Sequence, residues 1–284
     1  MEKIRKNKKV IAVFLIPAVL IYLCFELIPV VMSVYFSFND WPGLQAVPLK
    51  FVGFKNYSNL FHNAVFLKSL QNVLIYVVVS VILQVPIGFG LGLLIHHFKK
   101  GQRFFKAAFF IPMILSVTAV ALLWNFIYFP TDKGILNSLL IKIGLGNYIQ
   151  QWLVNPKTSL ICLIVVSTWT SVGYYMIICL AGLTSIPDSV LEAGELDGAT
   201  GWKKIWNLYI PMLWEPLKMS TIMVITGVLK IFDTVYILTP TGGTSNCTIV
   251  PALLMYNEAY RYGHYGTGSA IATVIFVLSA AVSI

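Results

Sequence analysis

Six long apolar runs constrain this chain more than any other feature of its sequence. An α-helix needs about 20 residues to cross roughly 30 Å of hydrocarbon, at about 1.5 Å of rise per residue. Five of the runs reach that length, and the last, which is shorter, ends with the chain. They lie approximately at Val10–Phe36, Leu70–Ile95, Ala107–Phe129, Leu160–Leu183, Leu213–Leu238 and Gly268–Ile284. The sequence therefore predicts an all-α, polytopic membrane helical bundle with six transmembrane helices.

The composition supports this class and excludes others. Of the 284 residues, 58% are hydrophobic and 11% are charged, whereas a soluble domain is about half apolar and roughly a quarter charged. The net charge of +9 is spread along an apolar chain rather than gathered on one basic face, which argues against a nucleic-acid partner. The four cysteines have no CxxC spacing, and the adjacent His96 and His97 point to different sides of a helix. We expect neither a metal nor a cofactor.

The basic residues predict the orientation. If the N-terminus is inside, twelve Lys and Arg fall in inner segments and seven in outer loops. The inner ones are Lys3, Arg5, Lys6, Lys8, Lys9, Lys99, Lys100, Arg103, Lys106, Lys203, Lys204 and Lys218. The outer ones are Lys50, Lys55, Lys68, Lys133, Lys142, Lys157 and Arg261. This excess predicts a cytoplasmic N-terminus.

The loop between the fourth and fifth runs, residues 185–211, is a predicted cytoplasmic helical hairpin. Ser185 is the candidate N-cap of its first helix, and Gly198 and Gly201 are expected to break that helix. Thr200 is the candidate cap of a second, amphipathic helix. We expect Pro211 to stop this second helix.

Small residues and carboxylates in the hairpin allow two interpretations. A rigid helix could insert into a groove of another protein, which small side chains would let approach closely. Alternatively, an amphipathic hairpin could lie on the membrane. The spacing of the residues favours neither.

Polar residues within the apolar runs are candidates for a solute pathway. Lys230 and Asp233 lie three apart, so one helical face could hold them as an ion pair. Such a pair could lock helices together or line the pathway. The weaker candidates are Gln84, Asn72, Asn125 and Trp169. Gly88 and Gly92 have the small-xxx-small spacing that predicts close helix packing.

The chain contains no Gly-Lys-Ser/Thr sequence and therefore no P-loop. We expect no enzymatic activity from the chain itself, so an active importer would need a separate subunit that hydrolyses nucleotide. Two alternatives remain. An ion-coupled secondary carrier would need intramembrane carboxylates organised for ion coupling. Glu26 and Asp233 are sparse for that purpose. A non-transporting membrane scaffold would use the hairpin only to recruit a soluble partner.

The hairpin resembles the EAA loop of the permeases of binding-protein-dependent ABC importers. The resemblance rests on Glu192-Ala193-Gly194, Asp197-Gly198-Ala199, Ile210-Pro211 and Pro216, at a fixed place between two spans. The Asp-Gly-Ala form is typical of the carbohydrate-uptake subfamily, and further matching positions extend along nearly the whole chain. The N-terminal pattern is similar to the maltose-transporter type of first permease subunit. Gly194 stands where the motif has its second alanine.

This resemblance implies a single transmembrane permease domain over residues 1–284 that contains the coupling hairpin. It implies alternating access in a bacterial or archaeal cytoplasmic membrane, with a carbohydrate as the solute. The implied partners are a second permease in a heterodimer, two ATP-binding subunits and an extracytoplasmic solute-binding protein. The residues implied to contact the ATPase are Glu192, Ala193, Gly194, Asp197, Gly198, Ala199, Gly201 and Pro211.

Overall fold

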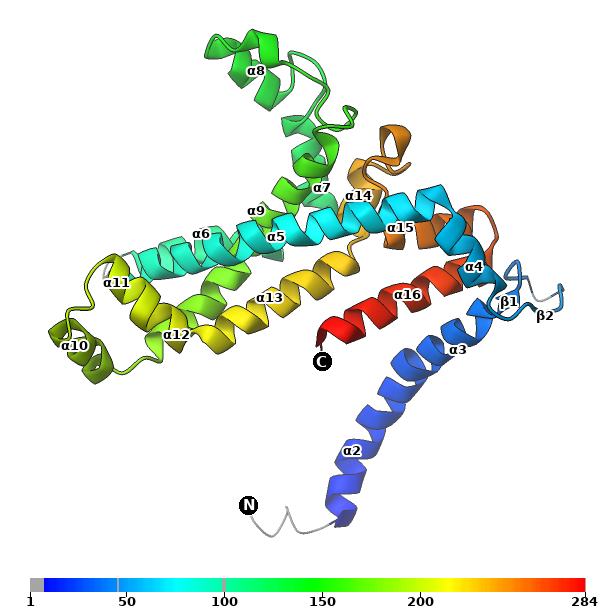
Figure 1. Cartoon of the computed structure of the whole chain (residues 1–284), viewed down its shortest axis with the longest axis horizontal. Helices are drawn as coiled ribbons and strands as arrows, with labels where there is room; N and C mark the ends of the chain where they lie inside the picture. The colour runs from blue at the N-terminus through cyan, green and yellow to red at the C-terminus, as the bar shows by residue number, and fades with distance from the viewer. Residues whose placement is uncertain (1–7, 45, 99–100, 284) are drawn as a thin grey trace. The chain divides into compact units, whose positions relative to one another are not determined.

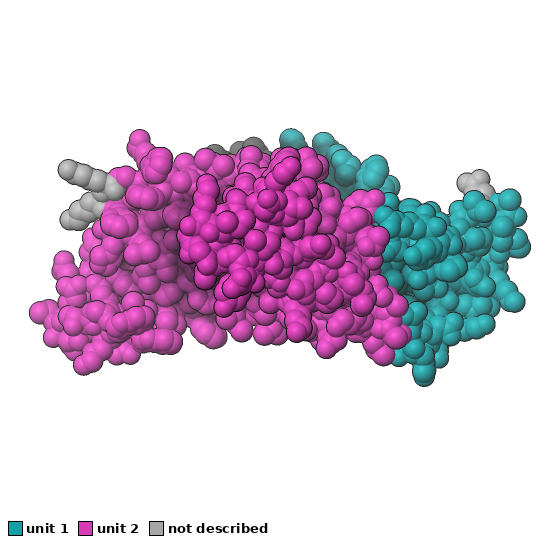
Figure 2. All heavy atoms as spheres, turned by 90° about the horizontal axis from the view of Figure 1, so that it is seen from above, with its two compact units in different colours: residues 1–63, 254–276 teal, residues 64–253, 277–284 magenta. Residues whose placement is uncertain are grey.

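Almost all of the regular structure is helical. The computed structural model describes residues 8–44, 46–98 and 101–283 (Figure 1). The contacts divide the chain into two compact units, residues 1–63 with 254–276 and residues 64–253 with 277–284 (Figure 2). Several basic residues used to predict the orientation lie outside the described residues, namely Lys3, Arg5, Lys6, Lys99 and Lys100.

The first apolar run forms a helix over residues 8–37 that contains one wide turn. α2 (Lys8–Tyr22) continues through the π-helical turn η1 (Leu23–Leu27) into α3 (Ile28–Ser37). Pro29 lies in the first turn of α3 and has no N–H to donate, which accounts for the wide turn just before it. Residues 12–37 are long and apolar enough to cross a membrane.

A short antiparallel ribbon, which the sequence did not predict, follows α3. It pairs β1 (Asn39–Asp40) with β2 (Lys50–Phe51) and leads to α4 (Lys55–His62). The buried Asn56 donates from Nδ2 to the Ser37 carbonyl oxygen at 2.8 Å, which holds α4 to the end of α3. The last helices of the chain are α15 (Pro251–Tyr256), η5 (Asn257–Arg261) and α16 (Tyr265–Ser283).

Long helices form the centre of the second unit. α5 (Ala64–His97) packs along α9 (Ser159–Thr184) and α13 (Trp214–Leu229), and α6 (Gln102–Ile114) packs against α9 (Figure 1). The smaller elements of this unit are α7 (Val117–Ile127), α8 (Ile135–Lys142), η2 (Gly146–Tyr148), α14 (Asp233–Leu238) and η4 (Thr244–Asn246).

Glycines let α5 and α9 approach closely. A Cβ atom added at Gly88 would lie 2.8 Å from Tyr175 Cβ, and one at Gly92 would lie 3.3 Å from Cys179 Cβ. The close packing predicted from the spacing of these glycines is therefore confirmed.

The predicted span over 107–129 is divided between two helices. α6 and α7 are bent by 97° relative to each other at a short break. Ser116 lies in this break and caps α7, since its Oγ accepts a hydrogen bond from the Ala119 backbone N–H at 3.2 Å. Among the described residues, four helices could each cross a membrane, or up to six if each bent pair forms one span.

The predicted span over 213–238 is interrupted as well. α13 ends at Leu229, and α14 begins only at Asp233. Lys230 and Asp233 therefore do not share a continuous helical face. Both side chains are exposed, and within the described part of the chain they form no ion pair with each other.

Candidate functional site

The first arm of the hairpin is α10 (Asp188–Leu196), and it begins without a side-chain cap. Pro187, in extended conformation, precedes it. Ser185 is not the N-cap that the sequence predicted. Its Oγ instead donates to the Gly182 carbonyl oxygen at 2.7 Å, so it completes the end of α9. Pro187 takes the capping position because its fixed φ leads the chain directly from α9 into α10.

Backbone hydrogen bonds define the end of α10. The Ala199 N–H donates to the Gly194 carbonyl oxygen at 2.8 Å, and the Gly198 N–H donates to the Glu195 carbonyl oxygen at 3.0 Å. These bonds form a Schellman motif, which requires a left-handed residue at the position that Gly198 occupies with φ +83°. The predicted break at Gly198 is confirmed, and the Asp-Gly-Ala sequence has a structural reason.

The second arm runs through Pro211 rather than stopping there. It comprises α11 (Trp202–Lys204), the π-helical turn η3 (Ile205–Tyr209) and α12 (Ile210–Met212). Pro211 sits in the first turn of α12, where a missing N–H is tolerated after the widened turn. Gly201, with φ +54°, precedes α11, and Thr200 provides no side-chain cap. The chain turns at Leu213, where this arm and α13 are bent by 73°.

A small apolar cluster fixes the hairpin to the long helices. Its buried members are Leu183, Ile186, Tyr209 and Leu213, and half-buried side chains from α5, α10 and α13 pack against them. Burying such side chains contributes roughly 1.5–3 kcal/mol each. The cluster therefore holds the hairpin against α9 and α13.

An ion pair joins the two arms. Lys204 Nζ lies 2.6 Å from Glu195 Oε1, and it also lies over the Tyr209 ring at 5.6 Å from the centroid. The hydrogen bond from Lys204 lowers the pKa of the Glu195 carboxyl. The same bond raises the pKa of Lys204. Both shifts favour the charged forms, so the ion pair is maintained at neutral pH.

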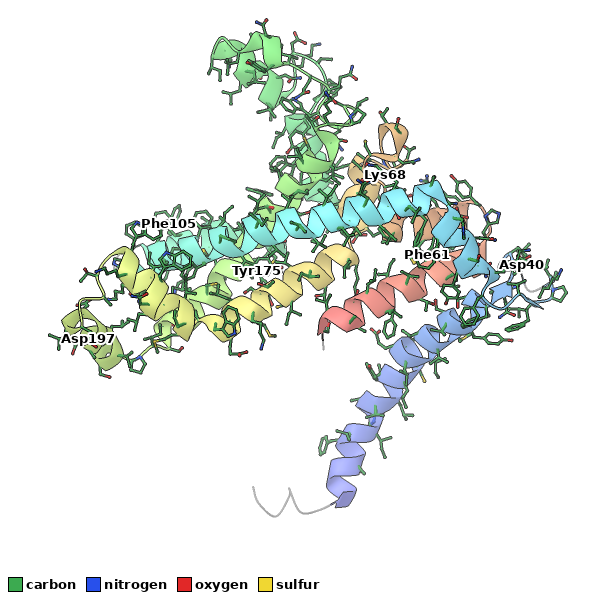
Figure 3. The ribbon with its side chains drawn as sticks, in the orientation of Figure 1. Asp40, Phe61, Lys68, Phe105, Tyr175 and Asp197 are labelled. Atoms are coloured by element: carbon green, nitrogen blue, oxygen red, sulfur yellow. The ribbon has the colours of Figure 1, made fainter. Side chains whose placement is uncertain are left out.

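The hairpin exposes large apolar side chains on the face turned away from the long helices. Leu196 is 90% exposed and Trp202 is 75% exposed, while Glu192 and Asp197 are also exposed beside them. Figure 3 shows Asp197 at the far end of the hairpin, away from α5 and α13. An apolar residue surrounded by carboxylates on a rigid helix suits a groove with an apolar floor and basic edges.

The other coupling residues predicted from the resemblance lie in the same hairpin. Ala193 and Gly198 are exposed, whereas Gly194 and Ala199 are half-buried where the two arms approach. The exposed Pro211 lies in the second arm. The structure thus places the predicted set in one hairpin.

Replacing Gly194 by Ala is expected to stabilise α10. The new Cβ would lie 3.3 Å from Leu208 Cδ2, the mobile end of a side chain, so the neighbour needs to move only slightly. The gain in helix propensity is up to about 1 kcal/mol. Hydrogen exchange of the α10 amides should slow in the Gly194→Ala variant. Exchange as fast as in the unmodified chain would show that Leu208 cannot move.

A cavity of about 210 Å³ lies between five helices of the second unit. Gln84 enters it from α5 and is only 2% exposed. Its amide hydrogen-bonds to no residue in the described part of the chain. Figure 3 labels Tyr175, which lines the cavity from α9. The other lining residues are Val117, Val120, Ser167, Thr170, Ser171, Val224, Gly227, Val228, Ile231 and Thr234.

The sequence reasoning missed the hydroxyl side chains of this cavity. Ser167, Thr170 and Ser171 lie at i, i+3 and i+4 on α9, so they share one helical face. A polar stripe with that spacing inside an apolar run was the signal that could have found them.

The remaining pathway candidates do not line the cavity. Trp169 packs edge-on against Trp124, with ring centroids 5.8 Å apart. Asn125 is half-buried on α7 and makes no side-chain hydrogen bond among the described residues. Lys230 and Asp233 are adjacent to lining residues in sequence, but neither belongs to the cavity wall.

Asn72 holds a distant loop. It is 1% exposed, and its Nδ2 donates to the carbonyl oxygens of Asn246 at 3.0 Å and Ile249 at 2.8 Å. The loop is unusual because Ser245 and Asn246, neither of them glycine, have positive φ. Asn72 therefore keeps a strained loop in place.

Replacing Asn72 by Leu is expected to loosen this loop. The change removes the side-chain donor from two loop carbonyl groups, although that of Asn246 still accepts from the Ile249 N–H at 3.3 Å. The loss costs about 1–3 kcal/mol. The temperature of thermal unfolding should fall, and the backbone amides of residues 242–249 should exchange their hydrogens faster. The matched control is Asn125→Leu, which removes an amide without hydrogen bonds and should change stability by less than about 0.5 kcal/mol. Equal effects in both variants would contradict the role of Asn72.

Comparisons with known proteins agree with this geometry. The family described as "Binding-protein-dependent transport system inner membrane component" matches residues 84–284. The chain is 36% identical over 284 residues to the probable ABC transporter permease protein YurN of Bacillus subtilis, covering 99% of this chain and 96% of that protein. It is 32% identical to the lactose transport system permease protein LacF of Rhizobium radiobacter, covering 95% and 89%.

The fold also matches a solved structure. A chain in the crystal structure of a bacterial alginate ABC transporter, in complex with an alginate pentasaccharide-bound periplasmic protein, superposes with a TM-score of 0.83. The identity is 21%, and the match covers 99% of this chain and 93% of that one. The family match and the permease relatives set aside an ion-coupled carrier and a non-transporting scaffold. The chain belongs to the inner membrane components of binding-protein-dependent transport systems, and it is the permease subunit of an ABC importer whose ATPase is a separate subunit.

Proposed function

We propose that this permease imports a carbohydrate by alternating access and that residues 185–212 transmit the motion of the ATPase. The observation that carries the coupling role is the hairpin itself. It is exposed at Glu192, Leu196 and Asp197, yet an apolar cluster attaches it to α5, α9 and α13. A force applied at its tip reaches the helices around the cavity.

Two kinds of observation support a carbohydrate as the solute, namely the names of related proteins and the lining of the cavity. The relative LacF is named for lactose transport, and the matched crystal structure contains alginate. In this chain, the cavity presents an amide and several hydroxyl groups, which suit hydrogen bonding to sugar hydroxyls. Gln84 is the pathway residue that we favour, ahead of Trp169, Asn72, Asn125, Lys230 and Asp233.

The assembly we propose contains this chain and a second, different permease, with two ATP-binding subunits inside and a solute-binding protein outside. In this assembly the two compact units form one permease domain with six spans, each bent pair counting as one. The N-terminus is cytoplasmic. A single cysteine introduced at exposed Ser189 should then react with a membrane-impermeant thiol reagent only from the cytoplasmic side.

The test of the function is ATP hydrolysis by the complete complex in proteoliposomes. Solute-binding protein loaded with a carbohydrate should raise the ATPase rate and drive that carbohydrate inward. The composition of the purified complex, measured by native mass spectrometry, tests the heterodimer. If no carbohydrate stimulated hydrolysis, while a solute of another class did, the proposed substrate class would be wrong.

A further inference from the structure

The cavity beside Gln84 has both polar and apolar walls, and none of the described residues that line it is charged. We propose that it accepts uncharged, hydroxyl-rich sugar units and rejects anionic sugars such as uronates and sugar phosphates. This inference rests on the proposed function, because it assumes that the cavity lies on the solute route. It narrows the substrate class from carbohydrates in general to neutral ones.

The first step of the argument is the unpaired amide. Gln84 is 98% removed from solvent, since its exposed fraction is 2%, and no described residue hydrogen-bonds to it. The amide lines the cavity, so water or a ligand there can supply the hydrogen bonds that the chain does not. An amide offers both donors and an acceptor, and a sugar hydroxyl group can serve either. The residue is therefore placed to bind a ligand that carries hydroxyl groups.

The second step concerns the hydroxyl groups that α9 contributes to the cavity. Thr170 donates its hydroxyl to the Val166 carbonyl oxygen at 2.8 Å, so its oxygen remains available as an acceptor. Ser171 makes no side-chain hydrogen bond within the described part of the chain. These two hydroxyls line the cavity that Gln84 enters, so they add polar partners to its amide.

The third step is charge. Lys230 and Asp233 are adjacent in sequence to the lining residues Ile231 and Thr234, but both are exposed and neither lines the cavity. A carboxylate or phosphate would lose its water here without meeting a cation, which is costly. A neutral hydroxyl would exchange its hydrogen bonds with water for hydrogen bonds with amide and hydroxyl groups.

The fourth step is size. The cavity has a volume of about 210 Å³ and is partly open rather than enclosed. It can hold a sugar ring, and its open side lets a longer chain extend out of it. An oligosaccharide would therefore place one of its units beside Gln84.

The experiment measures direct binding to the complete transporter complex in lipid nanodiscs, without the solute-binding protein. Saturation-transfer NMR would compare three matched probe sets, built on glucose, galactose and mannose. Each set contains the hexose, its uronate and its 6-phosphate. We expect transfer to at least one free hexose, reduced about fivefold or more by Gln84→Leu, and none to the uronates or phosphates.

The matched control is Gln71→Leu, the same change at an exposed position of α5. It should leave binding unchanged. Because Gln84 lacks a partner, Gln84→Leu should unfold at the same or a higher temperature than the unmodified complex, so a loss of binding would not reflect misfolding.

Two results would overturn the inference. Transfer to a uronate or phosphate that Gln84→Leu abolishes would show that the cavity accepts anions. Absence of transfer to every probe would show that the cavity binds no sugar unit. Either result leaves the proposed function standing, provided that a carbohydrate still stimulates ATP hydrolysis in proteoliposomes.

Discussion

Gly198→Arg is expected to abolish solute uptake while the chain still inserts and assembles in the membrane. Gly198 ends α10 at the exposed tip of the hairpin, and no described residue lies within 4 Å of a Cβ added there. The first atom of the new side chain therefore has free space. The arginine side chain would project from the surface that we propose for the ATPase, where bulk and positive charge would prevent docking.

Gly198→Arg also strains the backbone, because position 198 has a left-handed conformation. The effect of this strain needs its own control. Gly198 has φ +83°, and a non-glycine residue in the left-handed region costs roughly 1–2 kcal/mol. Gly144 is a close match, because it has φ +80° and likewise has nothing within 4 Å of an added Cβ. Gly144→Arg therefore imposes the same strain and the same bulk in the loop that follows α8.

The measurement is uptake of labelled solute by whole cells, with the amount of membrane-inserted permease determined on a blot. Gly144→Arg should retain most of the uptake, and Gly198→Arg should retain almost none at equal permease levels. Co-purification of the ATPase should be lost in parallel. Normal uptake by Gly198→Arg, or equal loss in both variants, would contradict the assignment of the hairpin as the coupling element.

The features that the sequence predicted well depend on local rules. The glycine at 198 marks the end of a helix because left-handed backbone favours glycine. Gly88 and Gly92 mark a helix contact because their spacing places them on one face. The run over 160–183 has clear apolar limits, and α9 (Ser159–Thr184) differs from it by one residue at each end.

The features that it missed depend on direction or on distant partners. Hydropathy measures how apolar a segment is and not the direction of its helix axis. The bend at Ser116 could therefore not be predicted from it. The partners of Asn72 are 174 and 177 residues away, and no local pattern connects them. Lys230 and Asp233 were expected on one helix, but the interruption after Leu229 separates them. Gln84 was a pathway candidate only because it is polar within an apolar run. The cavity that it lines becomes visible only when five helices are placed together.

Gly173→Ala is expected to weaken the whole second unit. The added Cβ would overlap the carbonyl group of Phe109, which is part of the α6 backbone. A backbone cannot rotate away as a side chain can, so α6 and α9 would have to separate. Overpacking of this kind typically costs 1–3 kcal/mol. Because the change also adds about 1 kcal/mol of helix propensity, a net loss would demonstrate the close contact.

Function should fall together with stability in this variant. Gly173 lies two residues beyond Ser171 on α9, so movement of this helix would displace the hydroxyl side of the cavity. The matched control is Gly90→Ala, also within a long helix, where nothing lies within 4 Å of the new Cβ. That variant should be as stable as the unmodified protein or slightly more stable. The two variants would be compared by thermal unfolding and by solute uptake, both measured on the complete complex. If Gly173→Ala behaved like Gly90→Ala, α6 and α9 would not be in close contact at Gly173.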